Sequence, residues 1–427
     1  MGSAASNESV AAQENSVLNF ERIELGNKQV IYHSFDDSTK IVSLDLAFKN
    51  SGYALDDFNK LGLTYLLLNI FRQAEIGKNP EQLRDIVEKY GIKLDFSAEA
   101  ENFYISVKYI KDFQSQVISL LQNFLEAEIF SEKIAEQNKE SLLKKYKNNL
   151  GNASFLGTIN LLDELFADSD LRKNPYGTEE TLANISLEDL EQFAKQRFTK
   201  AKLHMAISGN IDKKQAMELY GKLTRNLLDE YNLNFADYNL NYQPFDKQIS
   251  LAKDQILIKA FIPAPGKGSN NFYKYYLANY LIGGAGLTSV LSQELREKHG
   301  LTYSVYSHFD SYNNFAIWYV EFATDKENYD KSLKILQKTL KDIAKKGFDE
   351  AEINEAKKFL TGSYSIYFNT NEKISSYLLD SSLRKISPAI IRSRNKLINS
   401  YTVAEINEVI SKFVIPEQIS YIAVGDF

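Results

Sequence analysis

Hydrophobic and polar positions alternate near the start of this chain in the way that a strand with one buried face requires. In the segment IVSLDLAFKN, which spans residues 41–50, every second position is hydrophobic: Val42, Leu44, Leu46 and Phe48. The preceding segment QVIYHSF (29–35) is also extended in pattern. The chain is therefore expected to open with two strands, the second of them half-buried.

Further along, the apolar period changes to that of helices and then returns to that of strands. Helices are predicted over 60–73 and 80–90, the latter ending at a glycine, and two more within 113–149. Strands are predicted over 93–100, 102–110 and 204–210. This mixture predicts an α+β domain with a mostly antiparallel sheet.

A second domain begins after a polar stretch. Residues 225–253 are rich in Asn, Asp and Tyr and lack a helical period, so they are interpreted as an interdomain linker. The strand QILIKAFIP (255–263) then restarts the pattern, followed by a loop and a helix leading to GGAG. The predicted organisation is an N-terminal tag or trimmed, disordered segment, a first domain, the linker and a second domain, at 1–19, 20–224, 225–253 and 254–427.

Two pairs of segments indicate that the chain is duplicated. GLTYLLLNIFR (62–72) and GLTSVLSQELR (286–296) share the pattern G-L-T-x-x-L-x-x-x-x-R. Later in each half, a hydroxyl residue that should cap a helix, Ser186 or Thr402, precedes by the same interval a glycine at a strand end. The two domains are therefore expected to share one fold.

The segment LIGGAGLTSVLSQELREKHGLTYSVYS (281–307) resembles the C-terminal domain of pitrilysin-like (insulinase-like) zinc metallopeptidases. The resemblance is to the short-subunit branch that includes mitochondrial processing peptidase and the core proteins of respiratory complex III. NPYGTEETLANISLEDLEQFAKQRF (174–198) is similar to the end of the family's N-terminal domain. The resemblance extends from about Phe20 to Phe427 and implies one half of a peptidase clamshell, with two homologous domains.

The same resemblance implies that the zinc site of the family is lost. The family's H-x-x-E-H motif falls on GLTYLLLNIFR, where Tyr65, Leu68 and Asn69 replace the first histidine, the glutamate and the second histidine. The third ligand of the family falls near Lys144 and Lys145, and an ammonium group cannot ligate a divalent cation. A leucine cannot act as a general base. No metal site, and no metallopeptidase activity of the chain alone, is therefore expected.

In active members of this family, an arginine and a tyrosine seven residues apart in the C-terminal domain bind the substrate backbone and stabilise the oxyanion. Arg296 and Tyr303 have that spacing in R-E-K-H-G-L-T-Y. A guanidinium and a phenol hydroxyl are suitable donors to developing negative charge. The structural alternative is that Arg296 caps a helix end and Tyr303 fills the rim of a sheet.

Composition excludes several other functions. The 427 residues carry 50 basic and 56 acidic side chains with no long run of one sign, which argues against a nucleic-acid partner. Apolar runs are too short to span a membrane, and there is no cysteine for a disulfide or thiolate site. The GGAG cluster favours a tight turn capped by Thr288 or Ser289 over a phosphate site, because no Walker spacing follows it.

The sequence thus predicts a non-catalytic subunit of a heterodimeric zinc metallopeptidase, a pseudoenzyme that supplies Arg296 and Tyr303 to its partner's active site. The partner would carry H-x-x-E-H and the zinc, and a peptide would be the substrate. The alternative is an inert structural or peptide-binding scaffold of the same fold that forms a homodimer. An exported, bacterial periplasmic location is expected, with a cytoplasmic one as the alternative.

Overall fold

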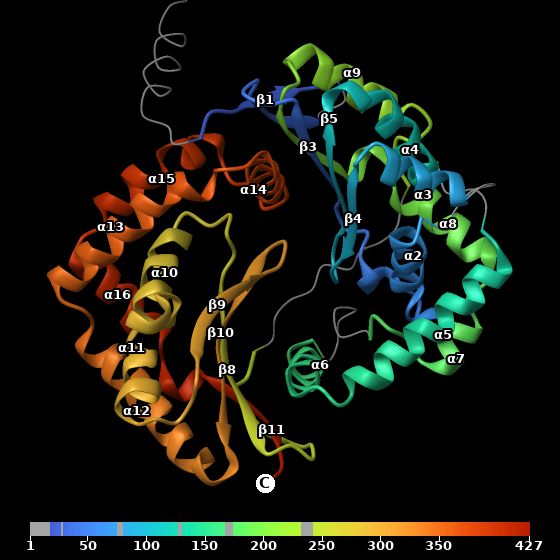
Figure 1. Cartoon of the computed structure of the whole chain (residues 1–427). Helices are drawn as coiled ribbons and strands as arrows, with labels where there is room; N and C mark the ends of the chain where they lie inside the picture. Colours follow the sequence, from blue (N-terminus) through green and yellow to red (C-terminus); the bar gives the residue numbers. More distant parts are fainter. Residues whose placement is uncertain (1–17, 27–28, 75–79, 127–129, 167–173, 232–241) are drawn as a thin grey trace, which may run out of the picture.

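The structure is a computed structural model that describes residues 18–26, 29–74, 80–126, 130–166, 174–231 and 242–427, arranged as two sheets with helices around them (Figure 1). The first sheet has the strand order β1-β2-β6-β3-β5-β4. Its strands are β1 (Glu21–Glu24), β2 (Val30–Phe35), β3 (Ile41–Phe48), β4 (Lys93–Ala98), β5 (Phe103–Ile110) and β6 (Leu203–Gly209). The pairs are antiparallel except for β2 with β6.

The second sheet has the order β7-β11-β8-β10-β9. Its strands are β7 (Asp246–Ser250), β8 (Gln255–Pro265), β9 (Val305–Ser311), β10 (Phe315–Asp325) and β11 (Ser420–Gly425). The pairs are antiparallel except for β7 with β11. The predicted α+β fold with two mostly antiparallel sheets is confirmed.

Helices cover both sheets. Those of the first half are α2 (Leu63–Arg72), α3 (Pro80–Lys89), α4 (Gln114–Glu126), α5 (Glu132–Asn149), α6 (Ala153–Leu165), α7 (Glu179–Ala183), α8 (Leu187–Arg197) and α9 (Lys213–Thr224). Those of the second half are α10 (Phe272–Asn279), α11 (Val290–Ser292), α12 (Tyr329–Lys346), α13 (Glu350–Tyr367), α14 (Asn371–Leu383), α15 (Pro388–Ser400) and α16 (Val403–Phe413). Two π-helical segments, Tyr280–Gly284 and Gln293–Lys298, flank α11.

The duplication predicted from the sequence is visible in the topology. Without β1, the first sheet reads β2-β6-β3-β5-β4, and the second repeats this order and its single parallel pair as β7-β11-β8-β10-β9. The predicted caps are present too, because Ser186 accepts a hydrogen bond from the amide of Asp189 and Thr402 from that of Glu405. These caps begin the equivalent helices α8 and α16, each of which leads into the central part of its sheet.

The prediction that β3 is half-buried is wrong, because both faces of this strand are covered. Val42, Leu44, Leu46 and Phe48 face the core of the first sheet as expected. On the opposite face, Ala47 packs against Leu378 and Leu379 of α14, a helix of the second half. Period-two alternation reports one apolar face but cannot reveal a cover that arrives more than 300 residues later in the chain.

The exchange of covering helices is reciprocal. α6, from the first half, lays Leu161 and Leu165 against β8 and β11 of the second sheet, where they contact Phe261, Ile422 and Val424. α14 lies beside the first sheet and α6 beside the second in Figure 1. Each sheet therefore buries one of its faces under a helix that belongs to the other half of the chain.

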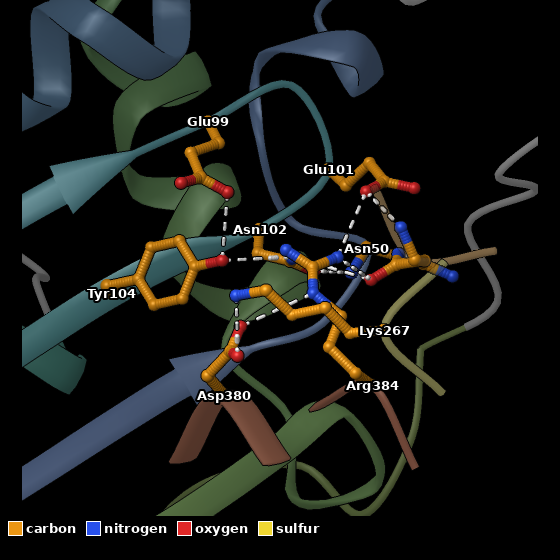
Figure 2. A network of polar contacts seen from close by, with 9 residues as sticks. Asn50, Glu99, Glu101, Asn102, Tyr104, Lys267, Asp380 and Arg384 are labelled. Atoms are coloured by element: carbon orange, nitrogen blue, oxygen red, sulfur yellow. Dashed lines mark hydrogen bonds and ion pairs between the residues drawn. The ribbon is translucent and has the colours of Figure 1, made fainter. Parts of the chain in front are cut away.

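A polar network also joins the two halves (Figure 2). Arg384, at the end of α14, lies 3.8 Å from Glu101 in the β4–β5 turn, and both side chains are about 95% buried. The amide of Asn313 donates to Glu101 at 2.7 Å, and the side chain of Asn313 donates to Asn50 at 3.0 Å. A buried ion pair is stable only when its remaining hydrogen-bond donors and acceptors also have partners. This network therefore favours a single relative placement of the two sheets.

The segments predicted to lie outside the domains are only partly described. Of the predicted N-terminal segment 1–19, residues 1–17 lie outside the described residues, while Leu18 is buried beside Phe20. In the predicted linker 225–253, Asp246–Ser250 forms β7 and pairs with β11, and 232–241 lie outside the described residues. In the part of the chain that the structure covers, none of the helices has the length and apolar character to cross a bilayer.

Candidate functional site

The helix that the resemblance assigns to the zinc motif is α2, and its start is fixed by backbone geometry. Gly62 precedes it at φ 96°, a conformation that glycine adopts without strain. A buried carboxylate, Asp56, accepts hydrogen bonds from the amide and hydroxyl of Thr64 at 3.0 and 2.6 Å. Arg197 of α8 pairs with Asp56 at 3.0 Å. The first turn of α2 is thus anchored to α8 and presents residues 65, 68 and 69 in a defined orientation.

Tyr65 stands where the first metal-binding histidine is expected and belongs to an aromatic cluster. Its ring is in edge contact with Tyr53 at 5.9 Å and with Tyr176 at 5.2 Å between centroids. Tyr176 in turn packs against Phe155 and Tyr146. Burial raises the pKa of Tyr65 above its ordinary value, so the hydroxyl stays protonated at neutral pH and acts as a hydrogen-bond donor.

Leu68 and Asn69 complete the predicted positions. Leu68 is buried in the first core and offers no titratable group. The side-chain oxygen of the buried Asn69 accepts a hydrogen bond from Nζ of Lys145, on α5, at 2.9 Å. Of the two lysines expected near the third ligand, Lys145 therefore makes the contact with α2, and it places a positive charge there that repels a metal cation.

The chemistry of these residues does not fit a zinc ion. Zinc in proteins is held by imidazole, carboxylate or thiolate, whereas this position offers a phenol, an aliphatic side chain, an amide and an ammonium group. Among the described residues, no group of three or more His, Cys, Asp or Glu side chains could hold a metal.

The edge of the first sheet beside α2 is blocked by side chains, which the sequence did not predict. β4 is the edge strand of this sheet. In an antiparallel pair, every second residue turns its backbone N–H and C=O towards the neighbouring strand. The amide of Glu99 donates to the carbonyl of Asn102, so Phe96 and Ala98 are among the residues of β4 whose backbone groups face away from β5. Nε of Arg72 donates to the carbonyl of Phe96 at 2.8 Å, and the hydroxyl of Tyr65 to that of Ala98 at 3.4 Å. In the sequence, the only signal that singled out Arg72 was its position at the end of the repeated G-L-T-x-x-L-x-x-x-x-R pattern.

Arg296 and Tyr303 lie together in the second half. Gly286 has φ 61°, and Ser289, one of the two predicted caps, accepts a hydrogen bond from the amide of Ser292. Leu295 is buried in the second core, which fixes the segment Gln293–Lys298 and leaves Arg296 at its surface.

The guanidinium of Arg296 lies 5.4 Å from the ring centroid of Tyr303. The Tyr303 side chain is 87% exposed, and Arg296 also pairs with Glu297 at 3.5 Å. The alternative prediction that Tyr303 fills the rim of a sheet is therefore wrong. The partly buried guanidinium and the exposed ring are therefore close enough for a cation–π contact.

The two sets of predicted residues do not form one site within this chain. Tyr65, Leu68 and Asn69 belong to α2, while Arg296 follows α11, and these helices lie on opposite sides of the molecule in Figure 1. Any site that combines an arginine and a tyrosine of this kind with a metal would require a second chain.

Comparison with known proteins shows which proteins this chain is similar to. Residues 184–360 match the model described as Peptidase M16 inactive domain. The chain is 26% identical to the non-peptidase homolog YmxG of Helicobacter pylori, over 85% of this chain and 83% of that protein. It is 21% identical to the uncharacterized zinc protease YmxG of Bacillus subtilis, over 74% and 76% of the two chains. The crystal structure of a peptidase M16 inactive domain from Pseudomonas fluorescens superposes with TM-score 0.88 at 18% identity, covering 96% of this chain and 98% of the other.

Proposed function

We propose that this chain, which is similar to a peptidase M16 inactive domain and to a non-peptidase homolog, is a non-catalytic subunit of a zinc metallopeptidase. In this proposal it supplies Arg296 and Tyr303 to the active site of a partner. The partner carries the H-x-x-E-H motif and the zinc, and a peptide is held between the two chains. The absence of a base or ligand set at Tyr65, Leu68 and Asn69 supports the lack of peptidase activity in this chain alone.

One observation carries the proposal: the guanidinium of the partly buried Arg296 lies 5.4 Å from the ring centroid of the exposed Tyr303. An exposed tyrosine that only filled space would be better placed in the core. A guanidinium held against a phenol ring is oriented in advance, and donors that are already oriented stabilise an oxyanion without reorganising during the reaction.

The edge strand β4 of this chain also supports a proposal in which the partner binds the substrate backbone. The carbonyls of Phe96 and Ala98 on β4 are already bonded to Arg72 and Tyr65. A peptide that adds to a sheet edge needs free backbone groups. The substrate is therefore expected to pair with the partner's edge strand rather than with β4 of this chain.

The test begins with recovery of the partner. The tagged chain is used to isolate bound proteins from its source cells, which are identified by mass spectrometry, and peptidase activity of the eluate is measured with and without chelator. A similar-sized partner with H-x-x-E-H and chelator-sensitive cleavage is expected. Fractionation of the same cells tests the proposed periplasmic location.

In the reconstituted pair, Arg296→Ala and Tyr303→Phe are expected to lower kcat/KM by the equivalent of about 2–4 kcal/mol, the usual effect of removing an oxyanion donor. Tyr306→Phe is the matched control, because Tyr306 is a nearby exposed tyrosine whose hydroxyl donates to Glu321 at 2.7 Å. Complex formation is measured by size-exclusion chromatography for each variant. Unchanged turnover in both Arg296→Ala and Tyr303→Phe would favour the inert scaffold, as would recovery of only a homodimer without activity.

A further inference from the structure

A cavity of about 850 Å³ lies in the second half of the molecule, away from α2 and from Arg296. It is lined by residues of α10, α13, α14, α15 and the edge strand β9. Its volume falls within the range of about 300–1000 Å³ that ligand sites occupy. One apolar side chain alone would not fill it.

Aromatic rings form a large part of the wall. They include Phe272, Tyr273, Tyr276, Phe309, Tyr364 and Tyr377. The hydroxyl of Tyr364 donates to that of Tyr377 at 2.8 Å, and burial raises the pKa of both groups, so they remain neutral. The wall is therefore apolar over its ring faces and has hydroxyl groups at fixed points.

A buried cation lies in this aromatic wall. The guanidinium of Arg394 is 4.0 Å from the ring centroid of Tyr364, and the residue is only 5% exposed. Nη1 donates to the carbonyl of Leu360 at 3.1 Å and to the side chain of Asn395 at 2.9 Å. Over the described ranges, Arg394 takes part in no ion pair with a carboxylate. Because a buried charge is costly without an opposite charge, the cavity favours an anionic group.

The other charged side chains that line the cavity also leave an excess of positive charge. Lys267 is paired with Asp380 at 3.0 Å (Figure 2), so these two charges cancel. Lys373 donates to the neutral side chain of Asn369 at 3.1 Å and lies 5.6 Å from the ring of Tyr367. Lys373 and Arg394 thus contribute positive charge that Asp380 does not neutralise.

The rim indicates a ligand larger than a small molecule. Ile366 and Tyr367, at the end of α13, line the mouth and are 70% and 49% exposed. On the other side, Phe309 belongs to β9, the edge strand of the second sheet. The mouth thus places exposed apolar side chains of α13 near an edge strand, and an edge strand can pair with an extended peptide.

We propose that this cavity binds a peptide segment that carries a large aromatic or aliphatic side chain next to a carboxylate. The apolar side chain would enter among the rings, and the carboxylate would face Arg394 and Lys373. The inference goes beyond the proposed function, because the site is formed by this chain alone and contains neither Arg296 nor Tyr303. It would give a non-catalytic subunit a means of selecting peptides, and it would serve equally in an inert scaffold.

The test uses the purified full chain and fluorescein-labelled peptides with the sequence Gly-Ser-Phe-Asp-Phe, measured by fluorescence polarisation. One matched peptide replaces the aspartate by lysine, and another replaces both phenylalanines by alanine. The acidic aromatic peptide is expected to bind at least about 10-fold more tightly than either, a difference of about 1.4 kcal/mol. Equal binding of the three, or no binding up to about 1 mM, would overturn the proposal.

Variants locate the binding. Lys373→Gln changes an exposed residue and is expected to lower the affinity for the acidic peptide about 10-fold while leaving the affinity for the lysine peptide unchanged. Arg394→Met is expected to lower the affinity for the acidic peptide further, and circular dichroism establishes whether that variant is folded. Lys358→Gln is the control, because Lys358 is exposed on α13 but does not line the cavity. If Lys358→Gln weakens binding as much as Lys373→Gln, the peptide binds through general charge and the proposed site is wrong.

Discussion

At the residue scale, the side chains around α2 are unsuited to a metal ion. Tyr65, Leu68 and Asn69 stand where the resemblance places the zinc motif, and Lys145 donates to Asn69 at 2.9 Å. The lysine matters as much as the missing histidines, because its ammonium group occupies hydrogen-bonding space beside position 69 and adds a positive charge there.

Rebuilding the motif should therefore require Lys145 to change as well. The triple variant Tyr65→His, Leu68→Glu, Asn69→His is expected to bind zinc at least about 10-fold more weakly than the same variant with Lys145→Glu, because the fourth change removes a repelling charge and adds a carboxylate ligand. Zinc affinity is measured by competition with a chelating dye. The matched control places glutamate at the neighbouring exposed position, Lys144→Glu, in the triple variant. An equal gain from Lys144→Glu would contradict the assignment of Lys145.

At the scale of elements, the edge strand β4 is the feature with a direct consequence. A free edge is a template for pairing with another strand, and Arg72 occupies the carbonyl of Phe96 that such pairing would use. Arg72→Leu is expected to expose this edge and to promote concentration-dependent self-association, measured by sedimentation velocity. Arg84→Leu is the control, since Arg84 is an exposed arginine on the adjacent α3. A monomeric Arg72→Leu variant, or equal association of both variants, would show that the Arg72 side chain does not protect the edge.

The same elements indicate what the sequence can predict. β4, β5, α2 and the helix pair α4–α5 follow their predicted ranges because strong local periodicity coincides with local burial. β7 lies within the predicted linker because DKQIS is a short, polar edge strand that forms only beside β11, about 170 residues later in the chain. Burial of the second face of β3 was missed for the same reason, since α14 follows β3 at an even greater distance in the sequence.

The candidate site shows the same limit. Resemblance located positions 65, 68 and 69 and the pair Arg296 and Tyr303, because motif spacing is local. The hydrogen bonds of Arg72 and Tyr65 to β4 arise from contacts between distant segments, and so does the position of Arg394 among tyrosines, where it has no carboxylate partner within the described part of the chain. No spacing rule connects such residues, so only the fold reveals them.

At the scale of the whole molecule, the two halves hold each other through α6, α14 and the network around Arg384. His204 of β6 lies in this contact, and its Nδ1 is 2.8 Å from the hydroxyl oxygen of Ser382 in α14. Burial, with smaller effects from the charges of Lys49 and Lys385, lowers the pKa of His204 to about 4. The folded protein therefore favours neutral His204, whereas the unfolded chain protonates it near the ordinary value of about 6.5.

Because the folded state binds fewer protons, stability should be fully present above about pH 6.5 and fall as the pH decreases towards 4. For this group alone the loss approaches about 1.4 kcal/mol per pH unit, or about 2 kcal/mol between pH 7 and pH 5. Urea unfolding at these two pH values is compared with His204→Asn, in which an amide replaces the titrating ring near Ser382. The variant should lose about 2 kcal/mol less than the native chain over this interval, since all other titrating groups are shared. Identical pH dependence in the two proteins would mean that protonation of His204 does not loosen the contact between α14 and the first sheet.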